Sequence, residues 1–139
     1  MNRLLEFIGR HPLIAAGVVV AWLAVMFYEL WLRSRGMTHV TAADAVRLIN
    51  RGALVLDVRK AEDFGAGHIV NAKNVALDKL EADQNAVHKK KDKILLTVCD
   101  NGTTSGRAAS VLRKAGYQNV FSLKGGLTGW RADNLPLVK

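Results

Sequence analysis

The sequence is poor in the residues that build disulfides and metal sites. Its 139 residues include one cysteine, Cys99, so no disulfide can form within the chain. A secreted miniprotein held by disulfides and a zinc site built on paired cysteines are therefore both excluded. The four histidines (His11, His39, His68 and His88) are too scattered to show metal-ligand spacing. We expect no metal site.

Acidic residues are also scarce relative to basic ones. The chain has 12 Asp and Glu against 20 Lys and Arg, a formal net charge of +8, and half of its residues are hydrophobic. Such an apolar composition excludes a disordered chain, and the length suits one domain with a short appendage. The basic residues are not interleaved with aromatic residues, so we expect no nucleic-acid partner.

One uncharged run near the N-terminus is long enough to cross a membrane. No residue from 13 to 28 is charged, and residues 13–32 make 20 predominantly apolar positions. About 20 helical residues match a hydrocarbon core of roughly 30 Å. The run lacks both the cleavage site of a signal peptide and the polar period of a buried helix. We expect a flank at 1–12, a single-pass transmembrane helix at 13–32 and a linker at 33–37.

Charges beside this run give a small orientation bias. Arg33 and Arg35 follow it, whereas the basic residues before it are partly offset by Glu6, which favours a cytoplasmic C-terminal part. A lone cysteine also suits a reducing compartment. Gly17 and Ala21 would let a second membrane helix approach, which leaves a membrane-protein partner open.

The remaining residues, 38–139, alternate strand patterns with helix patterns. Apolar and β-branched runs predict strands, and amphipathic segments with capping residues predict helices. Short connections between alternating elements imply an α/β domain with a mostly parallel central sheet flanked by helices. The predicted strands are 53–58, 72–75, 94–98 and 120–123, and the predicted helices are 42–51, 61–65, 78–88, 105–115 and 127–132.

Cys99 is placed where a parallel sheet usually binds ligands. It ends the predicted strand 94–98, and a polar loop containing Gly102 leads from it to a helix expected to begin at Ser105. Backbone N–H groups in such a loop can converge on one point and stabilise a thiolate, with help from the helix dipole. Cys99 is therefore a candidate nucleophile, and the alternative is a small buried residue that closes a strand.

Three motifs follow one another through the predicted domain. They are Leu56-Asp57-Val58-Arg59 with Glu62, Phe64 and Gly67-His68-Ile69; Cys99-x-x-Gly102-x-x-Ser105; and Leu123-Lys124-Gly125-Gly126 with Trp130. In this order and at this spacing, residues 38–137 resemble the rhodanese-like sulfurtransferases. A membrane span followed by one such domain is similar to membrane-anchored members of that family in bacteria, which implies a bacterial inner membrane location.

The resemblance implies sulfur transfer through a persulfide on Cys99. It implies a small-molecule or protein-bound sulfur donor, a thiol acceptor and no metal or organic cofactor. The substrate-binding residues would be those of the loop, Asp100, Asn101, Gly102, Thr103, Thr104 and Ser105. The alternative is a rhodanese-like interaction module with little turnover that acts as a membrane adaptor.

The loop departs from the family pattern at two positions. Many members carry a basic residue beside the cysteine or at the fifth loop position, where this chain has Asp100 and Thr104. Arg107 is the only cation nearby in sequence. Because Asp100 disfavours both a thiolate and an anionic donor, we expect weak thiosulfate activity and a preference for persulfide or protein-bound donors. Ser105 stands where a phosphatase would need arginine, which disfavours phosphoryl chemistry.

Three further residues are interpreted as structural, and one run as a surface. We expect Asp57 to cap backbone amides at a strand end, Arg59 to pair with Glu62, and His68 to hydrogen-bond nearby backbone. The alternative is that Asp57 and Arg59 form a pair that shapes the floor of the site. The basic run 89–93 is either solvated or in contact with anionic lipid headgroups, so membrane lipid is an expected partner.

Overall fold

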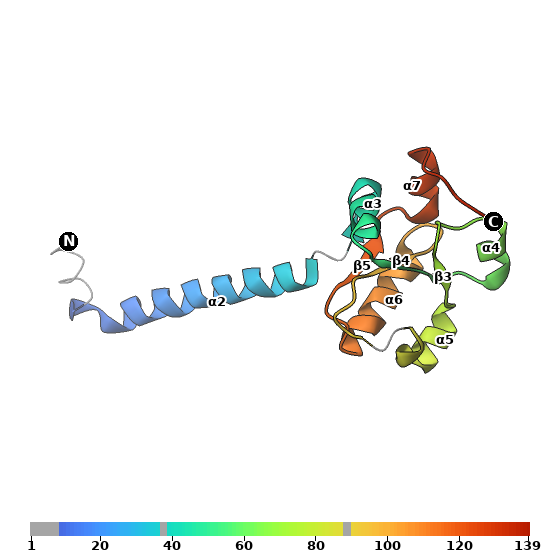
Figure 1. Ribbon diagram of the computed structural model, residues 1–139. Helices are drawn as coiled ribbons and strands as arrows, with labels where there is room; N and C mark the ends of the chain where they lie inside the picture. Colours follow the sequence, from blue (N-terminus) through green and yellow to red (C-terminus); the bar gives the residue numbers. More distant parts are fainter. Residues whose placement is uncertain (1–8, 37–38, 88–89) are drawn as a thin grey trace. The chain divides into compact units, whose positions relative to one another are not determined.

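The computed structural model describes residues 9–36, 39–87 and 90–139, and the chain divides into two compact units, 1–36 and 37–139. The first unit contains helix α2 (Pro12–Gly36) (Figure 1). Residues 12–31 of this helix are long and apolar enough to cross a membrane, and none of them is buried. The helix continues through residues 33–36, which were expected to be linker, because no glycine or proline interrupts them before Gly36.

The second unit is built on a five-stranded sheet of order β1-β5-β4-β2-β3, in which each neighbouring pair is parallel. This confirms the expected α/β fold class. Strand β1, which the sequence reading missed, has only two residues and no β-branched run. The strands are β1 (His39–Val40), β2 (Leu54–Asp57), β3 (Lys73–Asn74), β4 (Leu95–Val98) and β5 (Val120–Leu123).

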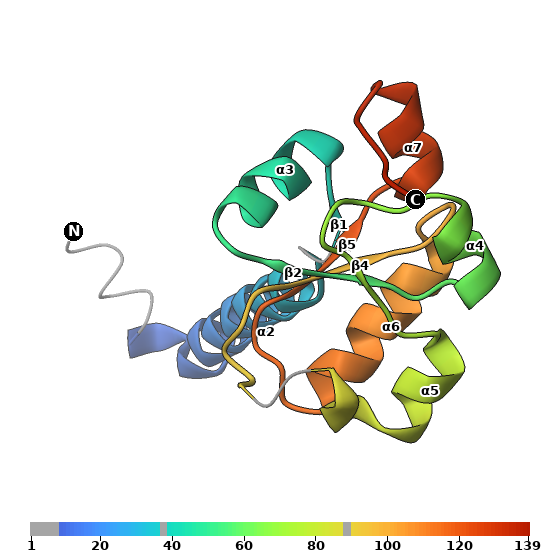
Figure 2. The same ribbon diagram turned by 45° about the vertical axis from the view of Figure 1, so that its right-hand side comes forward.

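Helices cover both faces of the sheet, with α3 and α7 on one face and α5 and α6 on the other (Figure 2). A hydrophobic core lies on each face of the sheet, and neighbouring residues of one strand pack into different cores because successive side chains point to opposite faces. Leu95 packs with α6, and Leu96 packs with α3 and α7. The helices are α3 (Ala42–Asn50), α4 (Ala61–Ala66), α5 (Leu77–Ala82), α6 (Thr103–Lys114) and α7 (Gly126–Ala132).

Two helices differ from their expected bounds. The helix expected over 78–88 is broken at Asp83, whose extended backbone (φ −144°) ends α5. The Asp83 side chain then caps a short 3-10 helix, η1 (Gln84–Ala86), by accepting from the backbone N–H of Asn85. Helix α6 begins at Thr103 rather than Ser105, which shortens the loop after Cys99.

Part of the basic run 89–93 is held against the domain. Lys89 lies outside the described residues, but Lys91 donates to the carbonyl of Ala115 and its Nζ lies 5.7 Å from the ring centroid of Tyr117. Lys91 therefore contributes to local packing at the end of α6, and the run is not a purely solvated stretch.

The sheet register brings the carboxyl ends of β2 and β4 together. Asp57 is paired with Val98, so the segment after β2 starts beside the segment after β4. Arg59 and Cys99 leave the sheet from these adjacent ends, although 40 positions separate them in the sequence. The fold thus places two of the predicted site residues at one edge of the sheet.

Candidate active site

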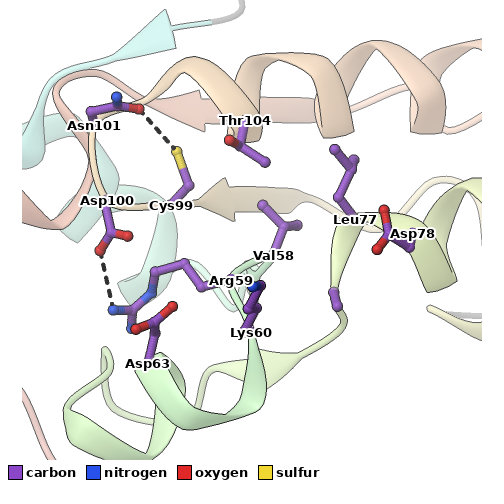
Figure 3. Close-up of a pocket in the computed structure, with 11 residues that line it drawn as sticks. Val58, Arg59, Lys60, Asp63, Leu77, Asp78, Cys99, Asp100, Asn101 and Thr104 are labelled. Atoms are coloured by element: carbon purple, nitrogen blue, oxygen red, sulfur yellow. Dashed lines mark hydrogen bonds and ion pairs between the residues drawn. The ribbon is translucent and has the colours of Figure 1, made fainter.

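The sulfur of Cys99 is surrounded by hydrogen-bonding groups of its own loop, two of which are backbone donors. The backbone N–H groups of Gly102 and Ser105 donate to Sγ at 3.0 and 3.3 Å. The hydroxyl of Ser105 lies 3.4 Å from Sγ, and the side-chain oxygen of Asn101 lies 3.9 Å from it (Figure 3). Cys99 is only 3% exposed, yet its sulfur is turned toward the loop that follows it. Converging N–H dipoles of this kind stabilise negative charge on sulfur.

The curvature of the loop depends on the first turn of α7. The backbone N–H groups of Leu127 and Thr128 donate to the carbonyls of Cys99 and Asp100 at 2.8 and 3.0 Å. Gly126 has φ +57°, and a Cβ there would collide with both of these carbonyls. Helix α7 therefore holds the carbonyls on its own side, which leaves the later amides of the loop free to face Sγ.

A layer of buried hydroxyl groups supports the loop from behind. The hydroxyl of Ser105 is 2.8 Å from that of Ser122 on β5 and donates to the carbonyl of Gly102 at 3.1 Å. Thr97 on β4 donates to the carbonyl of Ser105 at 2.9 Å. These three side chains are fully buried, and the contacts with Thr97 and Ser122 fix Ser105 relative to the sheet. The sequence reading missed Thr97 and Ser122, whose signal is a hydroxyl inside an apolar strand.

Arg59 connects the ends of β2 and β4. Its Nε and Nη2 contact the carboxylate of Asp57 at 2.7–3.1 Å, and Nη2 also donates to the carbonyl of Gly67 at 2.7 Å. Its Nη1 donates to Asp100 at 3.3 Å (Figure 3). The hydrogen bond with Asp57 is the main cause that raises the pKa of Arg59. The expected pairing with Glu62 is wrong, because Asp57 and Asp100 are the carboxylate partners in the described structure.

Cys99 opens on a pocket of about 450 Å³ between the ends of β2 and β4 and the start of α5. The wall combines apolar side chains with three carboxylates, those of Asp63, Asp78 and Asp100, and with the cations Arg59 and Lys60. A cysteine, converging amides and a hollow at strand ends together give a geometry that suits covalent catalysis. The lining residues are Val58, Arg59, Lys60, Asp63, Ala76, Leu77, Asp78, Cys99, Asp100, Asn101 and Thr104.

Comparison with known proteins agrees with this geometry. Residues 41–133 match the family described as the rhodanese-like domain. The chain belongs to this family. It is 35% identical over 145 residues to the uncharacterized protein YibN of Escherichia coli K12, covering all of this chain and 99% of that protein.

The rhodanese domain is also similar to a thiosulfate sulfurtransferase and to a protein of known crystal structure. The thiosulfate sulfurtransferase GlpE of Pseudoalteromonas translucida is 32% identical over 95 residues, which cover 68% of this chain and 89% of that protein. A rhodanese-related protein of Thermoplasma volcanium matches in structure with a TM-score of 0.65 and 28% identity, covering 72% of this chain and 96% of that one.

The six predicted loop residues of the rhodanese domain lie in three different places. Asp100, Asn101 and Thr104 line the pocket, whereas Gly102 and Ser105 contact Sγ from inside the loop. Thr103 faces another hollow, and its backbone N–H donates to the side chain of Asn101 at 3.1 Å.

Arg107 does not reach the rhodanese pocket. Its guanidinium pairs with Glu81 on α5 at 2.7 Å, and its side chain is 67% exposed. The cation that contacts the loop is instead Arg59, which comes from the neighbouring strand end and pairs with Asp100. The register of β2 with β4 is the signal that could have placed it there, because the loop sequence alone does not contain it.

Two predicted structural roles are observed. Asp57 accepts from the backbone N–H of Arg59 at 3.0 Å, and Nδ1 of His68 lies 2.9 Å from the carbonyl of Phe64. The His68 ring also stacks on Phe64 at 3.8 Å between centroids, so it is held away from the pocket. Among the described residues, no group of three His, Cys, Asp or Glu side chains is arranged to hold a metal ion.

Proposed function

We propose that the domain is a sulfurtransferase that carries sulfane sulfur as a persulfide on Cys99. The main support for this proposal is the position of Sγ. It accepts hydrogen bonds from the N–H groups of Gly102 and Ser105 at the edge of an open pocket. Membership of the rhodanese family and similarity to thiosulfate sulfurtransferases support the same chemistry.

The reaction proceeds in two displacement steps at sulfur. The Cys99 thiolate attacks the sulfane sulfur of a donor, a new S–S bond forms, and the bond from that sulfur to the rest of the donor breaks. The donor residue leaves with the electron pair, as sulfite when the donor is thiosulfate. An acceptor thiolate then attacks the outer sulfur and releases Cys99 as a thiolate, so no net oxidant is consumed.

The residues of the loop take different parts in these steps. The amides of Gly102 and Ser105 stabilise the charge on Sγ before attack, and the loop from Asp100 to Ser105 surrounds the outer sulfur after it. Three carboxylates in the pocket wall disfavour a doubly charged donor such as thiosulfate. A persulfide or protein-bound donor is therefore the preferred substrate.

We also propose that α2 anchors the domain in a bacterial inner membrane, with the rhodanese domain on the cytoplasmic side. The support is the unburied apolar window over residues 12–31 and the basic residues that follow it. Intact cells treated with a membrane-impermeant thiol reagent should leave Cys99 unlabelled, and lysed, denatured cells should show labelling. Labelling before lysis would contradict the cytoplasmic placement.

Intact-protein mass spectrometry tests the catalytic proposal directly. The full chain treated with a sulfane donor should gain roughly 32 Da, and a thiol acceptor should remove the gain. Cys99→Ser should abolish the gain, because the chain has no other cysteine. No gain with any donor would overturn the proposal and would favour a rhodanese-like membrane adaptor without turnover.

A further inference from the structure

Arg59 and Asp100 form an ion pair inside the wall of the sulfur pocket. The side chain of Arg59 is 5% exposed, whereas that of Asp100 is 64% exposed. Both residues line the pocket together with Cys99. The pair therefore joins a buried cation to an exposed carboxylate at the mouth of the pocket, next to Cys99.

The guanidinium of Arg59 is fixed on one side only. Asp57 and the carbonyl of Gly67 engage Nε and Nη2, which leaves Nη1 turned toward Asp100. A guanidinium nitrogen in a pocket wall binds anionic oxygens well, and the sulfonate of thiosulfate presents such oxygens. In this chain the carboxylate of Asp100 already occupies Nη1.

We propose that Asp100 is a specificity-determining residue, because its carboxylate occupies Nη1 of Arg59 and so closes an anion site beside Cys99. The pocket then favours sulfur donors that have no anionic oxygens next to the reacting sulfur, such as persulfides, over thiosulfate. This inference rests on the proposed role of Cys99 and names the class of donor that the same site accepts.

The other charges around the pocket act in the same direction. The pocket and its supporting pair contain four carboxylates and two cations, a formal excess of two negative charges at neutral pH. With Nη1 of Arg59 occupied, Lys60 is the other cation in the wall, and it is exposed. The four carboxylates are those of Asp57, Asp63, Asp78 and Asp100, and the two cations are Arg59 and Lys60.

Methanethiosulfonate reagents of opposite charge test this selectivity at Cys99 itself. The thiolate attacks the sulfenyl sulfur, a disulfide to the reagent's ethyl group forms, and methanesulfinate leaves with the electron pair of the broken bond. The trimethylammonioethyl reagent is cationic and the sulfonatoethyl reagent is anionic. The measured quantity is the ratio of their second-order rate constants with the full-length protein.

Three variants separate release of Arg59 from a general loss of negative charge. Asp100→Ala frees Nη1, whereas Asp100→Asn removes the charge but keeps an oxygen that can accept from it. Asp78→Asn is the matched control, because it removes one carboxylate from the same pocket without contacting Arg59 in the described structure. Asp100 is exposed, so its variants should fold, and thermal unfolding checks this.

We expect the native chain to favour the cationic reagent. Asp100→Ala should lower the cationic-to-anionic ratio by about tenfold, Asp100→Asn by less, and Asp78→Asn by about threefold or less. The rate of persulfide formation from thiosulfate should also rise, most in Asp100→Ala and less in Asp100→Asn and Asp78→Asn. Equal shifts in Asp100→Ala and Asp78→Asn, or no shift in Asp100→Ala, would overturn the inference.

The reagents also separate failure of this inference from failure of the proposed function. A Cys99 that reacts with both reagents but shows no charge preference contradicts only the role of Asp100. A Cys99 that reacts with neither reagent at neutral pH contradicts the nucleophile, and the inference fails with it.

Discussion

The two sides of Cys99 differ in charge: uncharged amides and hydroxyls lie on one side, and charged side chains lie on the other. On the inner side, backbone amides and the buried hydroxyl of Ser105 contact the sulfur, the hydroxyl of Ser122 supports Ser105, and none of these groups carries a formal charge. On the outer side, Arg59 and Asp100 meet across a pocket wall that is rich in charged side chains.

This difference separates reactivity from selectivity. The inner side meets only the sulfur atom, so it acts equally on every donor, and its geometry is fixed by the sheet and α7. The outer side meets the rest of the donor, and its exposed charge, that of Asp100, can change without disturbing the core. Changes on the inner side should therefore alter stability and all reactions of Cys99, whereas changes on the outer side should alter mainly the choice of donor.

The largest effect is expected for Gly126→Ala on the inner side. The added Cβ would collide with the carbonyls of Cys99 and Asp100, and the positive φ of this position disfavours alanine. We expect the free energy of unfolding to fall by about 3 kcal/mol. Labelling of Cys99 by both charged reagents should slow together, because the loop amides lose their alignment. Chemical denaturation and labelling rates measure the two effects.

Gly129→Ala is the matched control for this change. It lies in the same helix, and a Cβ there meets the carbonyl of Lys124 at an ordinary contact distance of 3.5 Å. Because alanine is the better helix former, we expect a gain of up to about 1 kcal/mol and unchanged labelling. Equal behaviour of the two variants would show that α7 does not fix the loop.

A smaller effect is expected for Ser105→Ala. The change removes the hydroxyl next to Sγ and leaves that of Ser122 without its partner in a buried site. We expect a loss of about 1–2 kcal/mol in the free energy of unfolding. The double variant with Ser122→Ala should be less destabilised than the sum of the single variants, because both partners are then absent. Additive losses would contradict a direct contact between the two hydroxyls.

The sequence was sufficient to predict the fold class and to locate the loop whose amides face Cys99. The signals were strong there, because the strands 54–57, 95–98 and 120–123 are mainly apolar, with one polar residue each, and the motifs follow a known order. The two-residue strand β1 carried no such pattern, and it is fixed by pairing with β5. The break at Asp83 depends on a side-chain cap that periodicity does not reveal.

The sequence near Cys99 was not sufficient to predict which charged side chains lie beside it. Arg107 is eight positions from Cys99 in the sequence, and its helix carries it toward Glu81. Arg59 is 40 positions away, and the pairing of β2 with β4 brings it to the pocket. The sequence alone predicts an unpaired Asp100 that repels anions, whereas in the structure this carboxylate forms an ion pair with Arg59.

The smallest effect is expected for Arg107→Gln, which tests that distinction between the two arginines. The pair of Arg107 with Glu81 is largely exposed, so the loss of unfolding free energy should be at most about 0.5 kcal/mol. The ratio of cationic to anionic labelling at Cys99 should stay unchanged, because Arg107 does not line the pocket. Glu81→Gln should behave alike. A change in that ratio as large as that of Asp100→Ala would place Arg107 on the outer side of the site, and charge selection would then no longer belong to Arg59 and Asp100 alone.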